Sequence, residues 1–501
     1  MRGAAFGAAG GTAMDDSSGL SDPGVAEPPS AAPALSYREF VARLHYRTWR
    51  LCHLAAAAFA MPAALDRLRW PAERLQRERE AKLRRIVAHA QAHAPWHARR
   101  LQGIDAARLT EADLGRLPVM TKDDLMENFD EIVTDRRLTL PLCDRHLSHL
   151  VEDRYLLGGY HIVSSGGSSG RRGVFAYDWD AWTQCFVGMQ RYAIARMGCA
   201  PSLRRRVTVG QVAAGKATHL TNALGQCFAN PLLKISTFPV MLPFARIVDG
   251  LNRLQPMVLQ GYPSMLHALA QEQERGGLAI APQIILSIAE PLLSETRAIL
   301  NRVFGVPVHN WWGTSEGGGM GMSCGYGPWL HLADDALIIE PVDEAGRPVP
   351  PGTRSAKIHV TNLFNRLMPI IRYEISDAVT VMPGPCPCGS AHRRVEDVEG
   401  RHEDAFVYGG GVVAHPVVFR TTLANHRDVL DYQVRQTGNG AAITVRQSRP
   451  FDHAALAAKI AASLAEIGVD DPSVTVSARD TLERHVSGKL ARYIPLSHGH
   501  A

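Results

Sequence analysis

A glycine- and serine-rich run at residues 163–173 is the first segment whose residue types suggest chemistry. Apolar residues precede it and a β-prone run follows at 174–177, so we expect a turn between two strands. Backbone N–H groups of such a turn can approach phosphate oxygens, while serine hydroxyls and arginines add donors. The run lacks the lysine of the common nucleotide-binding loop and does not fit the dinucleotide fingerprint; a flexible surface loop is the alternative interpretation. The candidate phosphate ligands are Ser165, Gly167, Ser168, Ser169, Gly170 and Arg171.

A second group of residues has the chemistry of metal ligands. Cys386 and Cys388 form a tight thiol pair around one proline, and Cys324 is separated from His331 by six residues. Together they could make a Cys₃His zinc site that joins two distant segments, and four protein ligands would imply a structural role. The spacing is not that of a standard zinc finger, and free thiols in a proline-rich turn are the alternative interpretation.

The bulk composition is that of a globular protein with more than one domain. The chain has 501 residues, of which 46% are hydrophobic and 21% are charged. A net charge of +5, from 54 basic and 49 acidic residues, is too small and too scattered to indicate a nucleic-acid partner. Sparse cysteines and the lack of an apolar secretory signal at the N-terminus predict a reduced, cytoplasmic protein.

The N-terminal part is expected to be helical after a disordered tail. Residues 1–35 are rich in Ala, Gly, Ser and Pro and show no periodic apolar face. Residues 37–101 have a helical pattern, and Pro95 is expected to end a helix that begins near residue 72. The uncharged run 51–65 is shorter than the roughly 20 residues of a membrane span, so we expect a buried or surface-docked helix without stable membrane insertion. Peripheral membrane association of residues 40–70 is an alternative that is compatible with enzyme activity.

The remainder of the chain predicts an α/β fold followed by a small α+β unit. From about 140 to 400, β-rich runs such as 206–209, 284–288 and 336–339 alternate with helical ones. Prolines crowd the segment 381–389, and a domain boundary is expected near residue 401. Beyond it, a hairpin around 438–440, an amphipathic helix at 453–467 and a last strand at 474–476 are expected. The predicted domains are therefore 36–400, helical up to about residue 110, and 401–501.

The glycine-serine run resembles the phosphate-binding loop of adenylate-forming enzymes. Residues 165–170 match that pattern, although Arg172 stands where the family usually has proline. Four further segments match in the family's order, at 310–316, 369–377, 400–404 and 487–492.

The resemblance implies roles for residues in these segments. Trp312 would stack near the adenine and acyl group, with Gly313 beside it, and Thr314 would approach phosphate. Glu316 would hold Mg²⁺, because a hard carboxylate suits a cation that bridges phosphates. Asp377 and Arg401 would bind the ribose, Lys489 would reach the carboxylate and α-phosphate, and Glu403 would lie at a hinge where the family usually has Asp.

Three segments, at 117–125, 260–264 and 289–292, look like the phenylacetate–CoA ligase family in particular. This resemblance covers roughly residues 70–500. It implies a large adenylate-forming domain with mixed sheets and flanking helices, a small mobile C-terminal α+β domain, and a possible homodimer.

The chemistry that the resemblance implies is ATP-dependent activation of a carboxylic acid to an acyl adenylate, followed by transfer to coenzyme A. The acyl pocket is expected around His219, Tyr262 and Trp311, which favours an aromatic or other apolar acid. Two alternatives remain open. The acyl group could pass to a carrier-protein thiol, an amine or a hydroxyl, or the chain could be a non-catalytic nucleotide-binding homologue.

Overall fold

The computed structural model of the chain describes residues 37–165, 172–197, 206–215, 217–290, 292, 294–396, 406–414, 416–423, 426–480, 482–483 and 493–496. The chain divides into two compact units, residues 1–44 and 45–501. The first unit contributes only the start of helix α1 (Tyr37–Arg67) to the described chain, and the tail predicted at 1–35 lies outside it. The elements below belong to the second unit.

Helices dominate the N-terminal part, as the sequence predicts. Helix α2 forms because Leu75, Leu83 and Ile86 recur on one face and are buried. It ends before Pro95, which occupies the first position of the next helix. Among the described residues, no helix is both long enough and apolar enough to cross a membrane. The helices here are α2 (Ala72–His93), α3 (Pro95–Arg100), α4 (Lys122–Glu127), α5 (Phe129–Ile132) and α6 (Leu140–Ser148).

A mixed sheet forms the centre of the large domain, and the predicted α/β class is confirmed. In the described chain its strand order is β13-β14-β9-β8-β7-β6-β5-β3-β4. The part from β7 to β4 is parallel, and the part from β7 to β13 is antiparallel. The strands are β3 (Val207–Ala213), β4 (Leu233–Pro239), β5 (Val258–Gly261), β6 (Ile284–Ile288), β7 (Val308–Thr314), β8 (Gly318–Ser323), β9 (Leu330–Leu332), β13 (Val381–Met382) and β14 (Arg394–Val395).

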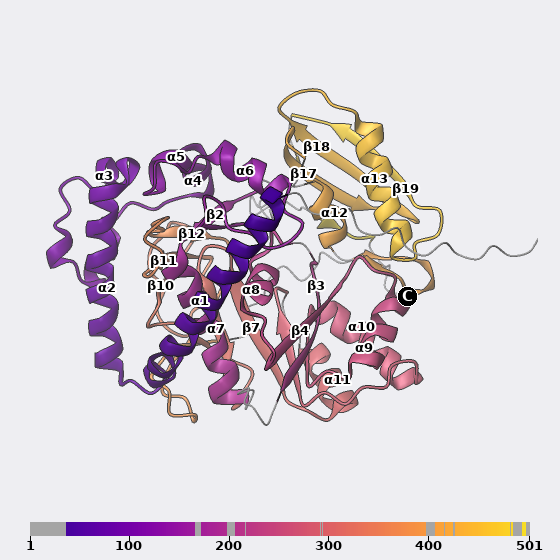
Figure 1. Cartoon of the computed structure of the whole chain (residues 1–501), viewed down its shortest axis with the longest axis horizontal. Coiled ribbons are helices and arrows are strands. Elements are labelled where there is room, and N and C mark those ends of the chain that lie inside the picture. The colour runs from indigo at the N-terminus through magenta and orange to yellow at the C-terminus, as the bar shows by residue number, and fades with distance from the viewer. Residues whose placement is uncertain are drawn as a thin grey trace, which may run out of the picture. The chain divides into compact units, whose positions relative to one another are not determined.

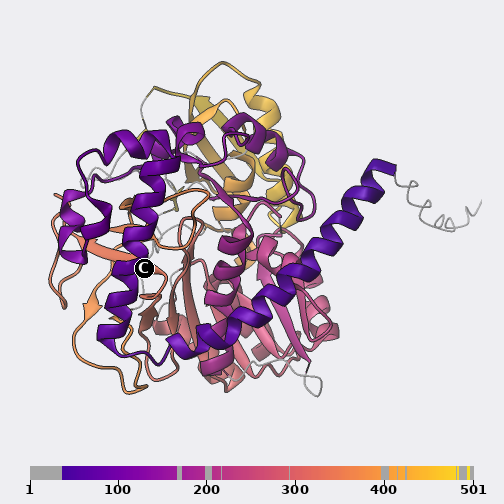
Figure 2. The ribbon, with the colours of Figure 1, turned by 60° about the vertical axis from the view of Figure 1, so that its left-hand side comes forward.

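Helices between the parallel strands cover the sheet and bury it. Every residue of β6 is buried, as expected for a short apolar parallel strand with both faces covered. Helices α9, α10 and α11 pack beside the parallel strands in Figure 1, and Figure 2 shows the same helices, in pink, against the strands. The helices are α7 (Trp179–Met197), α8 (Leu220–Phe228), α9 (Phe244–Leu254), α10 (Pro263–Arg275) and α11 (Ser294–Phe304).

Two smaller sheets border the main one. Strands β1 (His161–Ser164) and β2 (Val174–Tyr177) pair antiparallel on either side of the glycine-serine run, which confirms the predicted pair of flanking strands. Strands β10 (Leu337–Val342), β11 (Lys357–Asn362) and β12 (Tyr373–Ile375) form an antiparallel sheet that leads toward Asp377.

The C-terminal segment has an apolar core of its own, which includes Phe406, Phe419, Tyr432 and Ile460. The predicted hairpin and helix are confirmed as β17–β18 and α13. The prediction that the strand at 474–476 is the last one is wrong, because β20 follows β19. Strand β20 has two residues, too few to show a periodic pattern in the sequence. The boundary predicted near residue 401 falls outside the described residues and stays a prediction. The elements are α12 (Pro416–Leu423), β17 (Val429–Gln436), β18 (Gly440–Gln447), α13 (His453–Glu466), β19 (Ser473–Ala478) and β20 (Tyr493–Ile494).

Candidate active site

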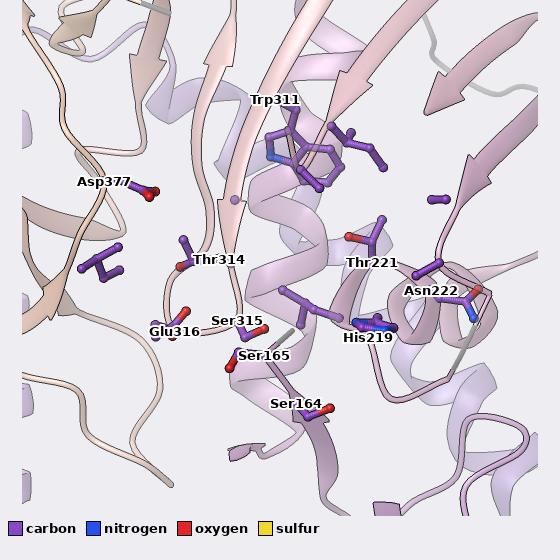
Figure 3. A pocket seen from close by; sticks show the side chains of 18 of the residues that line it. Ser164, Ser165, His219, Thr221, Asn222, Trp311, Thr314, Ser315, Glu316 and Asp377 are labelled. Carbon is purple, nitrogen blue, oxygen red and sulfur yellow. The ribbon is translucent and has the colours of Figure 1, made fainter. Parts of the chain in front are cut away.

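A cavity of about 440 Å³ lies at the carboxyl ends of the parallel strands. Ala213, Ile288 and Thr314 end three of these strands and line it, which is where open α/β sheets bind ligands. In Figure 3, Thr314, Glu316 and Asp377 lie on one side, and His219 and Asn222 lie on the other. The sequence-predicted site residues that line this cavity are Ser165, His219, Tyr262, Trp311, Gly313, Thr314, Glu316 and Asp377.

The turn between β7 and β8 carries the side chains most suited to phosphate and metal chemistry. The Gly317 N–H donates to the Thr314 hydroxyl oxygen at 3.1 Å, which fixes that side chain at the start of the turn. A Cβ at Gly313 would lie 2.9 Å from the Gly318 carbonyl oxygen, so only glycine allows the two strands to approach this closely. The turn therefore presents Thr314 and Glu316 to the cavity together.

Glu316 is a buried carboxylate facing a lysine. Burial raises its pKa, and the Lys122 ammonium partly offsets that rise. Asn362 donates to the Glu316 backbone carbonyl at 3.0 Å, so the turn is held from the small sheet that precedes Asp377. A hard, ionisable oxygen ligand beside hydroxyls is the donor set that Mg²⁺ selects in nucleotide sites.

Lys122 lines the cavity but was not predicted from the sequence to be a site residue. Its segment, 117–125, indicated only the resemblance to phenylacetate–CoA ligases. Lys122 is the first residue of α4, whose start is fixed by a capping box between Thr121 and Asp124. The cap directs Lys122 to the cavity, where its Nζ lies 3.4 Å from the Ser165 hydroxyl oxygen. The Gly173 N–H also donates to that oxygen, at 2.9 Å, and so ties the two sides of the glycine-serine run together at its base.

The two neighbouring tryptophans of β7 have different surroundings because successive strand residues point to opposite faces. Trp311 lines the cavity, whereas Trp312 is not among its lining residues. The Trp312 indole N–H donates to the Asp377 carboxylate at 2.8 Å. Trp312 is thus positioned to orient Asp377, and the aromatic wall comes from the residue before it.

The end of the cavity expected to hold the acyl group is more polar than predicted. Tyr262 accepts a hydrogen bond from the Ala214 N–H at 3.0 Å, which fixes its ring against the strand end. His219 precedes α8, and Asn222 in the first turn of α8 donates to the Gly215 carbonyl at 2.8 Å. Additional lining residues that the sequence did not single out as candidates are Met189, Gln211, Thr221, Asn222, Ala289, Tyr373 and Ser376.

Several predicted site residues lie outside the described part of the chain. They are Gly167, Ser168, Ser169, Gly170 and Arg171 of the glycine-serine run, together with Arg401, Glu403 and Lys489. Their roles stay predictions, as do those of the described residues.

The cysteines and the histidine proposed as metal ligands come together at another place. Cys324, His331, Cys386 and Cys388 lie within ligand distance of one another, and none of them lines the cavity.

Comparisons with known proteins agree with the resemblance noted from the motifs. No family model matches the chain. A phenylacetate–coenzyme A ligase of Thermus thermophilus is 26% identical over 396 residues, which cover 76% of this chain and 83% of the relative. An Escherichia coli protein of the same name is 25% identical over 359 residues, covering 68% and 74%.

Solved structures extend the likeness to the fold. A 2-hydroxyisobutyryl-CoA ligase bound to its acyl adenylate and CoA matches with a TM-score of 0.59 at 19% identity, covering 86% of this chain and 91% of that one. The same ligase in its postadenylation state matches with a TM-score of 0.57. The chain is therefore similar in sequence to phenylacetate–CoA ligases, and its fold is similar to that of an adenylate-forming CoA ligase.

Proposed function

We propose that this chain activates a carboxylic acid with ATP to form an acyl adenylate and then transfers the acyl group to coenzyme A. The observation that carries the proposal is the composition of one cavity. Hydroxyls of Ser165 and Thr314, the Lys122 ammonium and the Glu316 carboxylate face the same space as the aromatic wall of Trp311. The names of the relatives above support this choice among adenylate-forming reactions.

The first step joins the acid to the nucleotide. A carboxylate oxygen of the substrate attacks the α-phosphorus of ATP, and the bond to pyrophosphate breaks. Negative charge moves onto the leaving group, so donors already aimed at the phosphates lower the barrier. In the described chain Lys122 supplies a cation and Thr314 a hydroxyl for this purpose. The glycine-serine run, with Arg171, and Lys489 are proposed to add to them.

Glu316 is proposed to hold Mg²⁺, since a buried carboxylate among hydroxyl donors fits this ion. When bound, the ion would neutralise phosphate charge. Asp377 is proposed to accept hydrogen bonds from the ribose hydroxyls, with its orientation set by the Trp312 N–H. Arg401 would contact the ribose as well.

The second step uses the thiolate of coenzyme A. It attacks the carbonyl carbon of the mixed anhydride, forms the thioester bond and releases AMP. The C-terminal domain is proposed to rotate about the segment at Glu403 between the steps.

The acid is proposed to be aromatic or otherwise apolar, with some polar substitution. Trp311, Tyr262 and Met189 supply an apolar wall, whereas His219 and Gln211 can bind a hydroxyl or a second polar group.

ATP–pyrophosphate exchange tests the first step across aromatic, fatty and small carboxylic acids. Exchange with one acid class that falls by at least about 100-fold in Glu316→Gln, but not in the exposed control Glu344→Gln, supports the proposal. The acceptor is then tested by thioester formation with and without coenzyme A. A folded chain that binds ATP but exchanges with no acid contradicts the proposal, and exchange without thioester formation redirects the second step to another acceptor.

A further inference from the structure

Three thiols and one imidazole converge at the far edge of the main sheet, outside the proposed catalytic cavity. The ligand atoms of Cys324, His331, Cys386 and Cys388 all lie within 4.8 Å of one another. Cys324 follows β8 and His331 lies in β9, whereas the two other cysteines come from the turn between β13 and β14. Folding thus joins segments that are about sixty residues apart in sequence.

We propose that these four residues bind one zinc ion with a structural role. A tetrahedral zinc with Zn–S distances near 2.3 Å and a Zn–N distance near 2.05 Å requires S···S edges of about 3.8 Å and S···N edges of about 3.6 Å. The Cys324 and Cys386 sulfurs are 3.8 Å apart, and the Cys388 sulfur is 3.3 Å from His331 Nε2. A disulfide would need sulfurs near 2.05 Å, so the spacing fits a shared metal and not a covalent bond.

The histidine is oriented for metal binding by its other nitrogen. His331 Nδ1 lies 2.9 Å from the His392 carbonyl oxygen, which can only accept a hydrogen bond. The proton is therefore on Nδ1, and Nε2, which then carries the lone pair, lies 3.3 Å from the Cys388 sulfur and within 4.8 Å of the other two. A carbonyl behind a metal-binding histidine is a common second contact in zinc sites.

The surroundings shield most of the site from solvent. Cys324, His331 and Cys386 are buried, and Cys388 is partly buried. Gly389, at a φ of 78°, turns the chain directly after Cys388 and donates its N–H to the Cys386 carbonyl. Four protein ligands leave no open coordination position, which is the arrangement of structural zinc.

Such a zinc ion would stiffen two segments that matter for the proposed reaction. Strand β8 begins at the turn that carries Glu316, so Cys324 anchors the far end of that hairpin. Strand β14 pairs with β9 next to His331 and leads to the segment that contains Arg401. The metal would therefore fix the last part of the large domain before the predicted hinge.

Metal analysis of the purified full-length protein tests the proposal without any activity readout. Among the described residues, the other group of His and Cys side chains within reach of a metal is His53, His161 and Cys227, so Cys227→Ser is the matched control for Cys388→Ser. We expect about one zinc per chain in the wild type and in Cys227→Ser, and at least a tenfold lower content in Cys388→Ser. The proposal is overturned if the wild type contains no zinc after expression with added zinc. It is also overturned if Cys388→Ser keeps its zinc while Cys227→Ser loses it.

Cobalt substitution of the wild type keeps the test decisive where Cys388→Ser does not fold. Cobalt bound by three thiolates and one imidazole gives intense tetrahedral d–d bands and thiolate-to-metal charge-transfer absorption. These bands support the site. A weak octahedral spectrum after stoichiometric cobalt loading contradicts it.

Discussion

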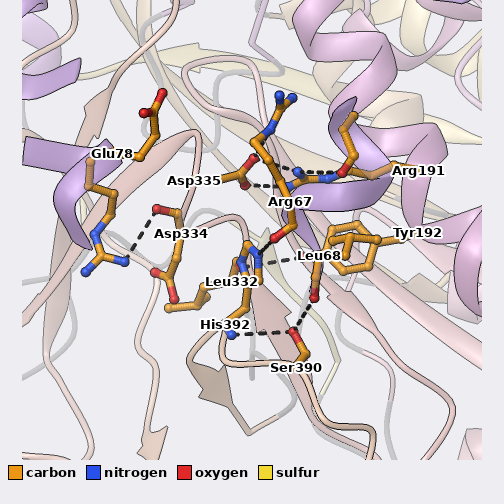
Figure 4. A network of polar contacts seen from close by, with 12 residues as sticks. Arg67, Leu68, Glu78, Arg191, Tyr192, Leu332, Asp334, Asp335, Ser390 and His392 are labelled. Atoms are coloured by element: carbon orange, nitrogen blue, oxygen red, sulfur yellow. Dashed lines mark hydrogen bonds and ion pairs between the residues drawn. The ribbon is translucent and has the colours of Figure 1, made fainter. Parts of the chain in front are cut away.

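Substituting Asp335 should destabilise the large domain more than any surface ion-pair change, because this carboxylate is a buried hub. Arg191 donates to it through both terminal nitrogens at 2.6 Å, and Arg67 donates at 2.8 Å (Figure 4). Side-chain exposures of 1% for Arg191 and 2% for Asp335 leave water almost no access to the pair. The hub ties the end of α1 to α7, which carries the cavity residue Met189.

The size of the effect follows from these contacts. Asp335→Asn keeps the shape of the side chain but removes its charge, so the Arg191 guanidinium stays buried without a counterion. Breaking a buried pair in this way costs roughly 3–5 kcal/mol. The Asn oxygen still accepts one of the three charge-assisted hydrogen bonds, each worth about 1.5–3 kcal/mol, so the lower part of that range is expected. A loss of about 3 kcal/mol in unfolding free energy is therefore the prediction.

Urea unfolding followed by tryptophan fluorescence measures this loss, with Glu274→Gln as the matched control. Glu274 pairs with Arg302 at 2.6 Å, but both side chains are exposed, so the control should change the free energy by less than about 1 kcal/mol. Arg191→Met in the Asp335→Asn background should recover part of the loss, because the buried guanidinium at position 191 is then gone. Equal effects of Asp335→Asn and Glu274→Gln would refute the reasoning.

The pH dependence gives a second check on the same residue. Burial opposes ionisation, but Arg191 nevertheless holds the pKa of Asp335 well below its usual value. A depressed carboxyl pKa contributes stability that is fully present above the unfolded value of about 3.9 and is lost as pH falls through the folded value. The wild type should therefore lose unfolding free energy more steeply below pH 4 than Asp335→Asn does.

Three further outcomes follow from the site and its surroundings. Lys122→Ala removes the ammonium near the glycine-serine run and should slow ATP–pyrophosphate exchange by about 10–100-fold, with partial recovery in Lys122→Arg. Trp312→Phe removes the N–H that orients Asp377 and should raise the KM for ATP about fivefold in the same assay while leaving the thermal unfolding midpoint nearly unchanged. Burial alone would lower the pKa of His161, but the Asp153 carboxylate 3.1 Å away raises it to about 9. The stability that comes from this raised pKa is fully present below about pH 6.5 and is lost as pH rises through 9. The unfolding free energy of the wild type should therefore fall over that interval, and that of Asp153→Asn should change less.

Local sequence signals predicted the parts of the fold that depend on neighbouring residues. Apolar runs on both sides of the glycine-serine segment specify β1 and β2, and a Gly-Asn-Gly turn specifies the β17–β18 hairpin. The α2 helix follows from the spacing of its leucines. These features need no knowledge of distant contacts, so periodicity and turn chemistry suffice.

Contacts between distant segments account for what was missed. Lys122 meets Ser165 across 43 residues, and Arg191 meets Asp335 across 144, and no local pattern links either pair. The assignment of Trp312 to the adenine depended on which face of β7 points to the cavity. Strand alternation guarantees that neighbouring tryptophans differ, but the sequence does not say which of them faces inward.

The charges around the cavity constrain how ATP can bind. Its described lining contains one ammonium, from Lys122, against the carboxylates of Glu316, Glu374 and Asp377. Glu374 is paired with Lys357 at 2.7 Å, so Glu316 and Asp377 are the two carboxylates that face Lys122, and a polyphosphate binds more tightly when positive charge is added to this set. A divalent ion at Glu316 supplies part of it, and Arg171 and Lys489 are the predicted sources of the rest. If they act together, the affinity of the wild type for ATP should fall steeply when the divalent ion is removed. Lys489→Ala, measured with magnesium present, should lower the affinity for ATP less than removal of the ion does, because that lysine is proposed to act on the α-phosphate during reaction.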